Sequence, residues 1–476
     1  MSDQITISIW VFLLMLLVTV WAILDRIFIP SVRWFLRRRI NRVLDEISHR
    51  LDIEIKPFQL TKRQILIDRL VYDAKVIEAI QSYAQEHDTP REILQSKVLM
   101  YAKEIVPSFN AYLYFRIGYW LAKKIARQLY SVRVGIGDDE QLTSVDPDST
   151  VVFVMNHRSN MDYLLVSFLA AERTTLSYAV GEWAKIWPLQ ALIKAMGAYF
   201  VRRNSSNPLY RLVLERYVHM ATKEGVCQAV FLEGRLSRDG RIQPPKLGLV
   251  DYMLRSFDPE ADRDIVFIPV GINYDRTLED RSLIRTLDPC AEKRSRWFVI
   301  KTTMGFIWRS LVLMILSRWQ RFGYACVNFG AYVSAREFSQ EYHINFSKID
   351  RNTRFVYVEK LCQRLMDSIK HNVPILPVSL VSAVLLDSAE NGLSAFDIEA
   401  NVNKLIETIE ARGATVYVST RSRAQTILTA LNTLKLRRMA IESDGLFRAD
   451  TESYDALSYY ANSIEHWRNT HSSFAP

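Results

Sequence analysis

The chain has 476 residues and carries 61 Lys and Arg against 52 Asp and Glu, which gives a formal net charge of +9. Its apolar fraction of 49% and charged fraction of 24% are typical of folded proteins and exclude global disorder. With 16 glycines and 15 prolines, the composition argues against a collagen-like or many-turned all-β chain and favours a helix-rich protein. The basic excess predicts an anionic partner, whether a membrane surface, a phosphorylated substrate, an acidic carrier protein or nucleic acid.

An uncharged apolar run, ITISIWVFLLMLLVTVWAIL, occupies residues 5–24. A helix of that length rises about 30 Å, enough to cross the hydrocarbon core of a bilayer. The preceding residues, MSDQ, lack the basic residues of a cleaved signal peptide, and a buried core helix is the remaining alternative. Because six arginines follow between residues 26 and 42, the positive-inside rule predicts a transmembrane anchor over 1–26 with the rest of the chain in the cytoplasm.

Residues 27–145 are predicted to form a helical N-terminal domain. Apolar residues recur every three or four positions over 40–53 and 60–83, and residues 111–130 form an amphipathic segment. That segment suits either a core-facing helix or a membrane surface. The turn residues SVDPDS at 144–149 then mark the boundary with the next region.

The pattern changes after this turn. Short β-branched apolar runs at 150–155, 227–232 and 264–270 are separated by helical stretches. Strands that alternate with helices predict an α/β domain, which we place at 146–340, with its chemistry beyond the carboxyl ends of the strands.

Two later regions complete the chain. Residues 281–321 form a basic amphipathic stretch, which is either interfacial or core-facing. Residues 341–476 are predicted to be a helical C-terminal domain, in which the apolar run 374–386 is too short to span a bilayer and is expected in the core.

The first polar cluster follows the first predicted strand and reads NHRSNMD, 156–162. His157 lies just off the strand, and Asp162 falls in the first turn of the helix expected next. With a tight turn, this spacing can bring the carboxylate to one imidazole nitrogen, which leaves the other nitrogen able to accept a proton. The alternative is a structural histidine at a helix start that Ser159 or Asn160 caps.

Three further clusters follow along the chain. Arg202 and Arg203 in GAYFVRR form either a forked anion site or a solvated surface pair. The run FLEGRLSRDGR, followed by PPKLG, places basic residues after Glu233 and Gly234, which suits either a phosphate site or a basic surface hairpin. The fourth cluster, IPVGINYDR, is a strand that ends in polar residues.

The order of these four clusters between residues 156 and 276 closely resembles the four sequence blocks of the glycerolipid acyltransferases. HRSNMDYLL, GAYFVRR and PPKLG are most similar to the membrane-bound glycerol-3-phosphate acyltransferase branch, and YYANSIEHW at 459–467 also resembles that branch. The resemblance implies an α/β fold with a mixed sheet and covering helices, flanked by helical N- and C-terminal regions and one N-terminal transmembrane helix.

The resemblance also implies a role for each matching residue. His157 would be the general base, oriented by Asp162, and Tyr274, Asp275 and Arg276 would lie on the acyl-donor side. The residues that would hold glycerol phosphate are Arg202, Arg203, Glu233, Gly234, Arg235, Ser237, Arg238 and Lys246. The family usually has an arginine directly before this serine, where the chain has Leu236. Either Arg235 supplies that guanidinium from one position earlier, or Arg238 and Lys246 hold the phosphate alone.

The implied reaction transfers a fatty acyl group from acyl-CoA or acyl carrier protein to the sn-1 hydroxyl of glycerol 3-phosphate. Its implied place is the cytoplasmic face of a bacterial inner membrane, with membrane lipid and no nucleic acid as partner. The chain has no GxSxG motif, so direct transfer without an acyl-enzyme is expected. Because HExxH, GxGxxG and P-loop motifs are also absent, we expect no metal and no cofactor.

Two alternative functions stay open. The acceptor could instead be dihydroxyacetone phosphate or lysophosphatidate, because both would use the same base. The protein could also be a non-enzymatic, membrane-anchored scaffold whose basic residues bind lipid or nucleic acid. The absence of a CxxC pair among the four cysteines fits a reducing compartment for either function.

Overall fold

The computed structural model describes Met15, Thr19 and residues 56–136, 145–170, 175–181, 189–202, 205–287, 322–388, 392–418 and 422–468. Apart from Met15 and Thr19, the expected anchor at 1–26 lies outside these ranges, as does the expected helix at 40–53. Of the basic stretch 281–321, only residues 281–287 are described. Within the described ranges, every helix is too short or too polar to traverse a bilayer.

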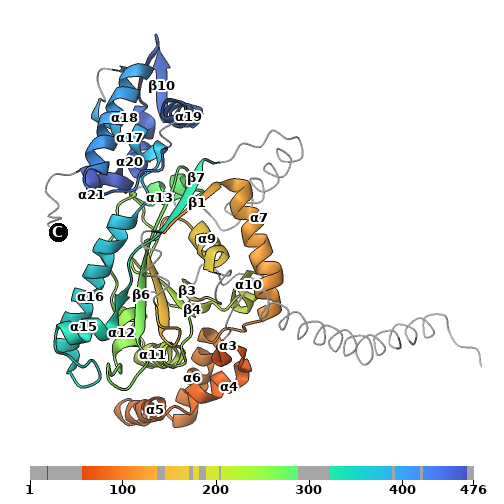
Figure 1. Ribbon diagram of the computed structural model, residues 1–476. Helices are drawn as coiled ribbons and strands as arrows, with labels where there is room; N and C mark the ends of the chain where they lie inside the picture. Colours follow the sequence, from red (N-terminus) through yellow and green to blue (C-terminus); the bar gives the residue numbers. More distant parts are fainter. Residues whose placement is uncertain are drawn as a thin grey trace, which may run out of the picture.

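A mixed sheet forms the centre of the molecule, as the α/β prediction requires (Figure 1). Its strand order is β1-β7-β6-β2-β5-β3-β4, and β8 pairs with β6. The strands are β1 (Ser131–Ile136), β2 (Thr150–Met155), β3 (Ser177–Gly181), β4 (Tyr199–Val201), β5 (Gln228–Phe231), β6 (Ile265–Tyr274), β7 (Tyr324–Phe329) and β8 (Val333–Ser334). From β6 to β4 all neighbours are parallel, whereas β7 is antiparallel to β6. The carboxyl ends of β2, β3, β4 and β5 therefore reach one edge of the sheet.

The central strand β6 explains why the sheet is covered on both faces. All its ten residues are buried, which matches its almost uninterrupted apolar sequence IVFIPVGINY. Side chains alternate along the strand, so Ile265 and Phe267 enter one core while Val266 and Ile268 enter the other. Gly271 lies where α16 (Arg351–Asn372) ends, and an added Cβ would collide with the backbone there.

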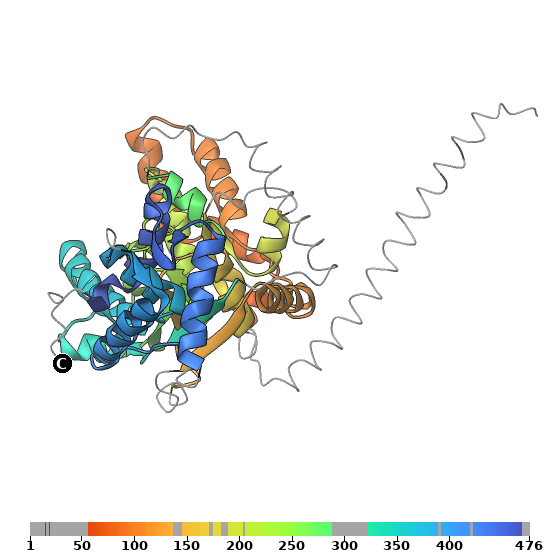
Figure 2. The ribbon, with the colours of Figure 1, turned by 90° about the horizontal axis from the view of Figure 1, so that it is seen from above.

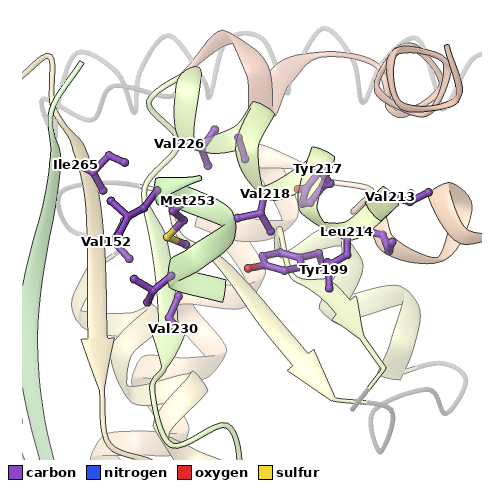
Figure 3. Packing of buried hydrophobic residues seen from close by; sticks show 14 of the residues in the cluster. Val152, Tyr199, Val213, Leu214, Tyr217, Val218, Val226, Val230, Met253 and Ile265 are labelled. Atoms are coloured by element: carbon purple, nitrogen blue, oxygen red, sulfur yellow. The ribbon is translucent and has the colours of Figure 1, made fainter. Parts of the chain in front are cut away.

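Helices cover the two faces separately. Helices α11 (Pro208–Lys223), α12 (Gly248–Leu254) and α16 pack on one face, and α7 (Tyr119–Leu129) and α9 (Met161–Ala170) on the other (Figure 1). Figure 3 shows the first core from close by, where Val152, Val230 and Ile265 of the sheet meet Val218 of α11 and Met253 of α12. α10 (Leu189–Ala195) and α13 (Asp280–Arg285) connect strands at the sheet ends.

The N-terminal helices belong to the core of the sheet domain. They are α3 (Pro57–Leu60), α4 (Arg63–Val71), α5 (Ala74–Glu86), α6 (Arg91–Ile105) and the π-helical turn η2 (Leu113–Gly118). Side chains of α3 to α6 share the first core with the sheet. The single helix expected at 60–83 is two helices, because the side chain of Asp73 accepts the N–H groups of Lys75 and Val76 and so starts a new helix. The sheet also begins at β1, inside the region expected to be helical.

The C-terminal region divides differently from the expected boundary at 341. α15 (Ala335–Glu341) and α16 pack into the sheet core, and a second core starts at Ile375. Its helices are α17 (Pro377–Asp387), α18 (Ala395–Glu410), α19 (Arg423–Leu436), α20 (Tyr454–Ala461) and α21 (Glu465–Arg468), with 3-10 turns η5 (Thr451–Ser453) and η6 (Asn462–Ile464). It is not wholly helical, since β9 (Leu393–Ser394), β10 (Ala440–Ser443) and β11 (Leu446–Ala449) form a small antiparallel sheet. Helix α17 is buried, as expected for 374–386.

The second core stands at one end of the molecule and α3 to α6 at the other (Figure 1), and the helices of the second core lie in front when the molecule is seen from above (Figure 2). Three cysteines in the described ranges, Cys227, Cys326 and Cys362, are buried. The molecule therefore consists of a large sheet domain, which includes the N-terminal helices, and a smaller C-terminal domain on top of it.

Candidate active site

A cavity of about 610 Å³ opens at the edge where the parallel strands end. His157 follows β2, Glu233 follows β5, Gly181 ends β3 and Arg202 follows β4, and all four line this cavity. The first three polar clusters of the sequence thus meet at the carboxyl edge of the sheet, where parallel α/β folds place their binding sites.

His157 and Asp162 form a buried pair at the start of α9. The imidazole Nδ1 lies 2.9 Å from Asp162 Oδ2, and the two residues are 1% and 0% exposed. Asp162 also accepts the backbone N–H of Arg158 at 2.7 Å and that of Ser159 at 3.0 Å, and the hydroxyl of Tyr274 donates to its other oxygen at 2.6 Å. Because the carboxylate is an acceptor in each contact, Nδ1 is the imidazole nitrogen that carries the proton.

The other imidazole nitrogen, Nε2, is buried and has no hydrogen-bond partner among the described residues. The ring stacks on Phe231, with centroids 3.9 Å apart, and meets the edge of Tyr163 at 5.4 Å. Ser159 Oγ accepts the N–H of Met161 at 3.1 Å, so the helix start is capped as well as paired. An imidazole that is held in one tautomer, on a residue that lines the cavity, has the arrangement that general base catalysis requires, and this role stays a prediction.

Glu233 holds the backbone of the base. Its two oxygens accept the N–H of His157 and the N–H of Gln243, each at 2.9 Å. Burial raises the pKa of this carboxyl to about 7, although both N–H groups favour the charged form. Glu233 therefore connects the strand end that carries His157 to the following loop.

The loop between β5 and α12, residues 234–246, brings cations to the same cavity. Arg235, Arg238 and Lys246 all line it. Gly234 has φ +69°, and an added Cβ would lie 2.9 Å from Lys246 Cγ, so the position requires glycine. Arg235 lines the cavity, whereas Leu236, at the position where the family usually has an arginine, does not. The hydroxyl of Ser237 donates to the carbonyl of Arg241 at 2.7 Å, so it stabilises the loop from within.

The two arginines after β4 have different outcomes. Arg203 lies outside the described residues. Arg202 donates from Nε and Nη2 to Glu104 of α6 at 2.9 and 2.6 Å, and its guanidinium lies over the rings of Tyr101 and Tyr210. This ion pair raises the pKa of Arg202. The charge of Arg202 is thus already paired with Glu104 of α6, so the side chain is not the solvated surface group of the alternative prediction.

The fourth cluster does not line the cavity. Tyr274 instead orients Asp162, as described above. Asp275 accepts the N–H of Tyr324 at 2.8 Å and that of Val378 at 3.2 Å, and burial raises its pKa to about 6. The guanidinium of Arg276 lies 4.0 Å from the centre of the Phe322 ring. Asp275 thus joins the sheet to the C-terminal domain, and contact of these residues with an acyl donor stays a prediction.

Sequence reasoning did not identify Glu279, which supports the start of α9. Its carboxylate accepts the hydroxyl of Ser159 at 2.7 Å and the backbone and side-chain N–H groups of Asn160 at 3.2 and 3.1 Å. Burial raises the pKa of Glu279. Its partners are 119 and 120 positions away in the chain, so no local spacing could have revealed it.

In the comparison with known proteins, the chain matches two family models. The "Acyltransferase" model covers residues 135–273, and the model "Glycerol-3-phosphate acyltransferase C-terminal region" covers 310–473. The first includes the base and the cationic loop, and the second includes most of the C-terminal domain.

Curated relatives named glycerol-3-phosphate acyltransferase match most of the chain. The protein of Pseudomonas entomophila (strain L48) is 29% identical over 365 residues, 75% of this chain and 42% of its own length. Those of Shewanella pealeana and Pseudomonas paraeruginosa are 27% and 26% identical and cover 86% and 90% of this chain, but 50% and 51% of their own lengths. The chain thus spans about half the length of the curated relatives it matches.

Among solved structures, the 1-acyl-sn-glycerophosphate acyltransferase of Thermotoga maritima aligns with 65% of this chain and 96% of its own, at 16% identity and a TM-score of 0.30. This chain is thus similar to acyltransferases over 135–273, to the C-terminal region of glycerol-3-phosphate acyltransferases over 310–473, and to curated proteins named glycerol-3-phosphate acyltransferase over most of its length.

Proposed function

We propose that the protein transfers an acyl group from an acyl thioester to the sn-1 hydroxyl of glycerol 3-phosphate and so makes lysophosphatidate. One observation carries the proposal: His157, whose buried Nε2 has no hydrogen-bond partner among the described residues, lines a cavity that Arg235, Arg238 and Lys246 also line. A proton acceptor beside a cluster of cations suits an acceptor that carries both a hydroxyl and a phosphate.

The acceptor binds through its phosphate in this proposal. Arg238, Lys246 and Arg235 neutralise the phosphate, and Arg203 joins them as the family resemblance implies. Fixing the phosphate holds the hydroxyl near His157, which converts a bimolecular encounter into an oriented one. The apolar wall of the same cavity, with Val180, Val201, Leu214 and Phe231, suits the chain of the acyl donor.

The chemistry then needs one base and no covalent enzyme intermediate. Nε2 of His157 removes the hydroxyl proton while the oxygen attacks the thioester carbonyl. The carbon–oxygen ester bond forms, the carbon–sulfur bond breaks, and the imidazolium returns the proton to the leaving thiolate. Asp162 stabilises the imidazolium through Nδ1. Positioned base catalysis of this kind contributes roughly 10²–10⁴-fold.

An acyl-transfer assay with purified protein tests the proposal. It combines two donors, acyl-CoA and acyl carrier protein, with glycerol 3-phosphate, dihydroxyacetone phosphate and lysophosphatidate as acceptors. We expect glycerol 3-phosphate to be the preferred acceptor. Activity on lysophosphatidate without activity on glycerol 3-phosphate would reject the choice of acceptor, and acyl transfer to none of the three would favour the scaffold alternative.

We also propose that the enzyme works at the cytoplasmic face of a bacterial inner membrane, held by residues 5–24. The uncharged run and the arginines that follow it support this placement. Membrane attachment suits a reaction whose acceptor is soluble and whose product has a lipid tail. Fractionation of cells that express the chain with and without residues 1–26 tests it, and an unchanged membrane fraction would contradict the anchor.

A further inference from the structure

The loop at 234–246, here named the acceptor loop, has a support outside the sheet domain. Asn462 in the C-terminal domain donates from Nδ2 to the carbonyl of Asp239 at 2.8 Å. Arg241 at the loop tip forms an ion pair with Glu465, with Nη2 3.2 Å from Oε1. Gly240 has φ +84°, and an added Cβ would overlap the carbonyl oxygen of Tyr459. The tip of the loop therefore lies directly on α20, η6 and α21.

Arg158, the neighbour of the base, reaches the same contact. Its buried guanidinium donates to the carbonyl of Gly240 and, at 3.3 Å, to Asn273 of β6. The guanidinium carbon lies 5.0 Å from the ring centre of Tyr459, whose hydroxyl donates to the carbonyl of Arg158 at 3.3 Å. The segment that carries His157, the acceptor loop and helix α20 thus meet around one arginine.

The supporting segment is itself rigidly held. Tyr459, Tyr460 and Ile464 are 0% exposed in the second core. The hydroxyl of Ser463 lies 2.8 Å from that of Ser379 in α17, and Asn273 donates to it at 3.3 Å. The segment that contacts the loop is therefore anchored in the core of the C-terminal domain by burial and hydrogen bonds.

The acceptor loop needs such a surface because of its own composition. Arg235, Arg238 and Lys246 line one cavity, so their like charges repel one another until an anion binds. The tip from 238 to 243 contains no helix or strand. Among the described residues, the side chain of Asp239 accepts hydrogen bonds only from its neighbours Ser237, Arg241 and Gln243. Contacts from outside the loop decide whether the three cations stay together.

We propose that Asn462 and the Arg241–Glu465 pair are positioning residues for acceptor binding, through which the C-terminal domain holds the acceptor loop in its phosphate-binding shape. The inference rests on the proposed function, because it assigns the phosphate of the acceptor to that loop. It predicts that a change on the C-terminal domain alters the KM of the phosphorylated acceptor more than that of the acyl donor.

Asn462→Ala removes the amide donor and tests the first contact. We expect the KM for glycerol 3-phosphate to rise about fivefold, the loss expected for one hydrogen bond, with kcat, the KM for the donor and Tm changed little. Asn432→Ala, an exposed asparagine on α19, is the matched control and should leave every constant unchanged. An unchanged KM for glycerol 3-phosphate, or an equal rise for both substrates, would overturn the proposal.

A charge swap tests the second contact independently. Arg241→Glu and Glu465→Arg each place like charges together and should raise the KM for glycerol 3-phosphate, whereas the double variant restores the pair and should restore the KM. Failure of the double variant to recover would count against positioning by this pair.

Binding of inorganic phosphate by calorimetry separates the two proposals. If the wild type acylates no acceptor, the proposed function fails, but Asn462→Ala should still weaken phosphate binding relative to Asn432→Ala. If acylation occurs and phosphate binds both variants equally, the proposed function stands and this inference fails.

Discussion

At the scale of single residues, the proposed chemistry depends on how the carboxylate of Asp162 orients His157. It accepts hydrogen bonds from His157, Arg158, Ser159 and Tyr274, so its orientation depends on a strand end, a turn and the distant end of β6 together. A carboxylate that is held in this way keeps the imidazole in one tautomer with Nε2 as the acceptor. Stacking on Phe231 fixes the plane of the ring.

His157→Ala should lower kcat for acyl transfer by at least about 10²-fold, because the general base is lost while the cavity persists. Steady-state kinetics checks the rate, and a thermal melt checks that the variant is folded. The exposed His343 offers a matched control, since His343→Ala should leave kcat within twofold of the wild type. Comparable rates for wild type and His157→Ala would disprove the assigned base.

Tyr274→Phe removes the hydroxyl that donates to Asp162 at 2.6 Å and leaves the buried ring in place. We expect kcat to fall about tenfold with little change in KM, since a hydrogen bond to a charged group contributes about 1.5–3 kcal/mol. Tyr130→Phe is the control, because Tyr130 is also buried but donates to the carbonyl of Arg276 at 2.7 Å instead. Equal losses in the two variants would mean that the Tyr274 hydroxyl serves packing alone.

At the scale of elements, α16 secures the helix that follows the acceptor loop. Arg354 of α16 donates from Nε to Asp251 of α12 at 2.8 Å, and the two side chains are 9% and 1% exposed. Asp251 also forms an ion pair with Arg255, which in turn forms an ion pair with Glu215 of α11. This buried charge network links three helices on one face of the sheet.

Arg354→Met should lower the free energy of unfolding by about 3 kcal/mol, because it leaves the buried Asp251 with one cation in place of two. Urea unfolding measures the change. Arg364→Met on the same helix is the control: its pair with Glu341 is about half exposed and screened by solvent, so little or no loss of stability is expected. If both variants lose the same amount, the buried network does not stabilise α12.

Elements were predictable from the sequence where one local pattern dominated. The β-branched runs at 150–155, 227–232 and 264–270 mark β2, β5 and β6 because buried strands are continuously apolar. β6 extends four residues further, to Tyr274, because β7 pairs with its polar end. The strands β9 to β11 have two to four residues each, too few for a periodic signal, and only their pairing with one another defines them.

At the scale of the whole molecule, buried polar contacts join the two cores. Asp275 bonds the N–H of Val378 at the start of α17, and Arg437 and Tyr460 of the C-terminal domain both reach Asp280 of α13. Asp275, Asp280 and Tyr460 are buried, so loss of their partners would leave unpaired polar atoms between the domains. Buried hydrogen bonds and ion pairs therefore connect the C-terminal domain to the sheet domain that carries the site.

The stability that Glu233 and Asp275 contribute should fall as pH rises from about 4 to 7. Burial raises the pKa of Glu233 to about 7 and that of Asp275 to about 6, from ordinary values of 4.5 and 3.8. In that window the folded protein keeps protons that the unfolded chain has released, so each group contributes stability that is fully present below its ordinary pKa and is lost as pH passes the raised value. The contribution of Glu233 is on the order of 2–3 kcal/mol.

Urea unfolding at pH 5 and pH 7.5 measures this dependence for the wild type and for Glu233→Gln, which has no titrating group at that position. The difference in unfolding free energy between the two proteins should be larger, in favour of the wild type, at pH 5 than at pH 7.5. A difference that is the same at both pH values would contradict the raised pKa.

The sequence by itself determined the α/β class, the contact between His157 and Asp162 and the order of the polar clusters, because each of these depends on residues that are neighbours in the chain. The pair of His157 and Asp162 spans a single turn, so its spacing alone was informative. Only the tertiary structure decided that Glu104 neutralises Arg202, that Tyr274 orients Asp162 and that Tyr459 supports Arg158. Those partners lie 98, 112 and 301 positions apart, and folding brings them together through side-chain packing that no local pattern encodes.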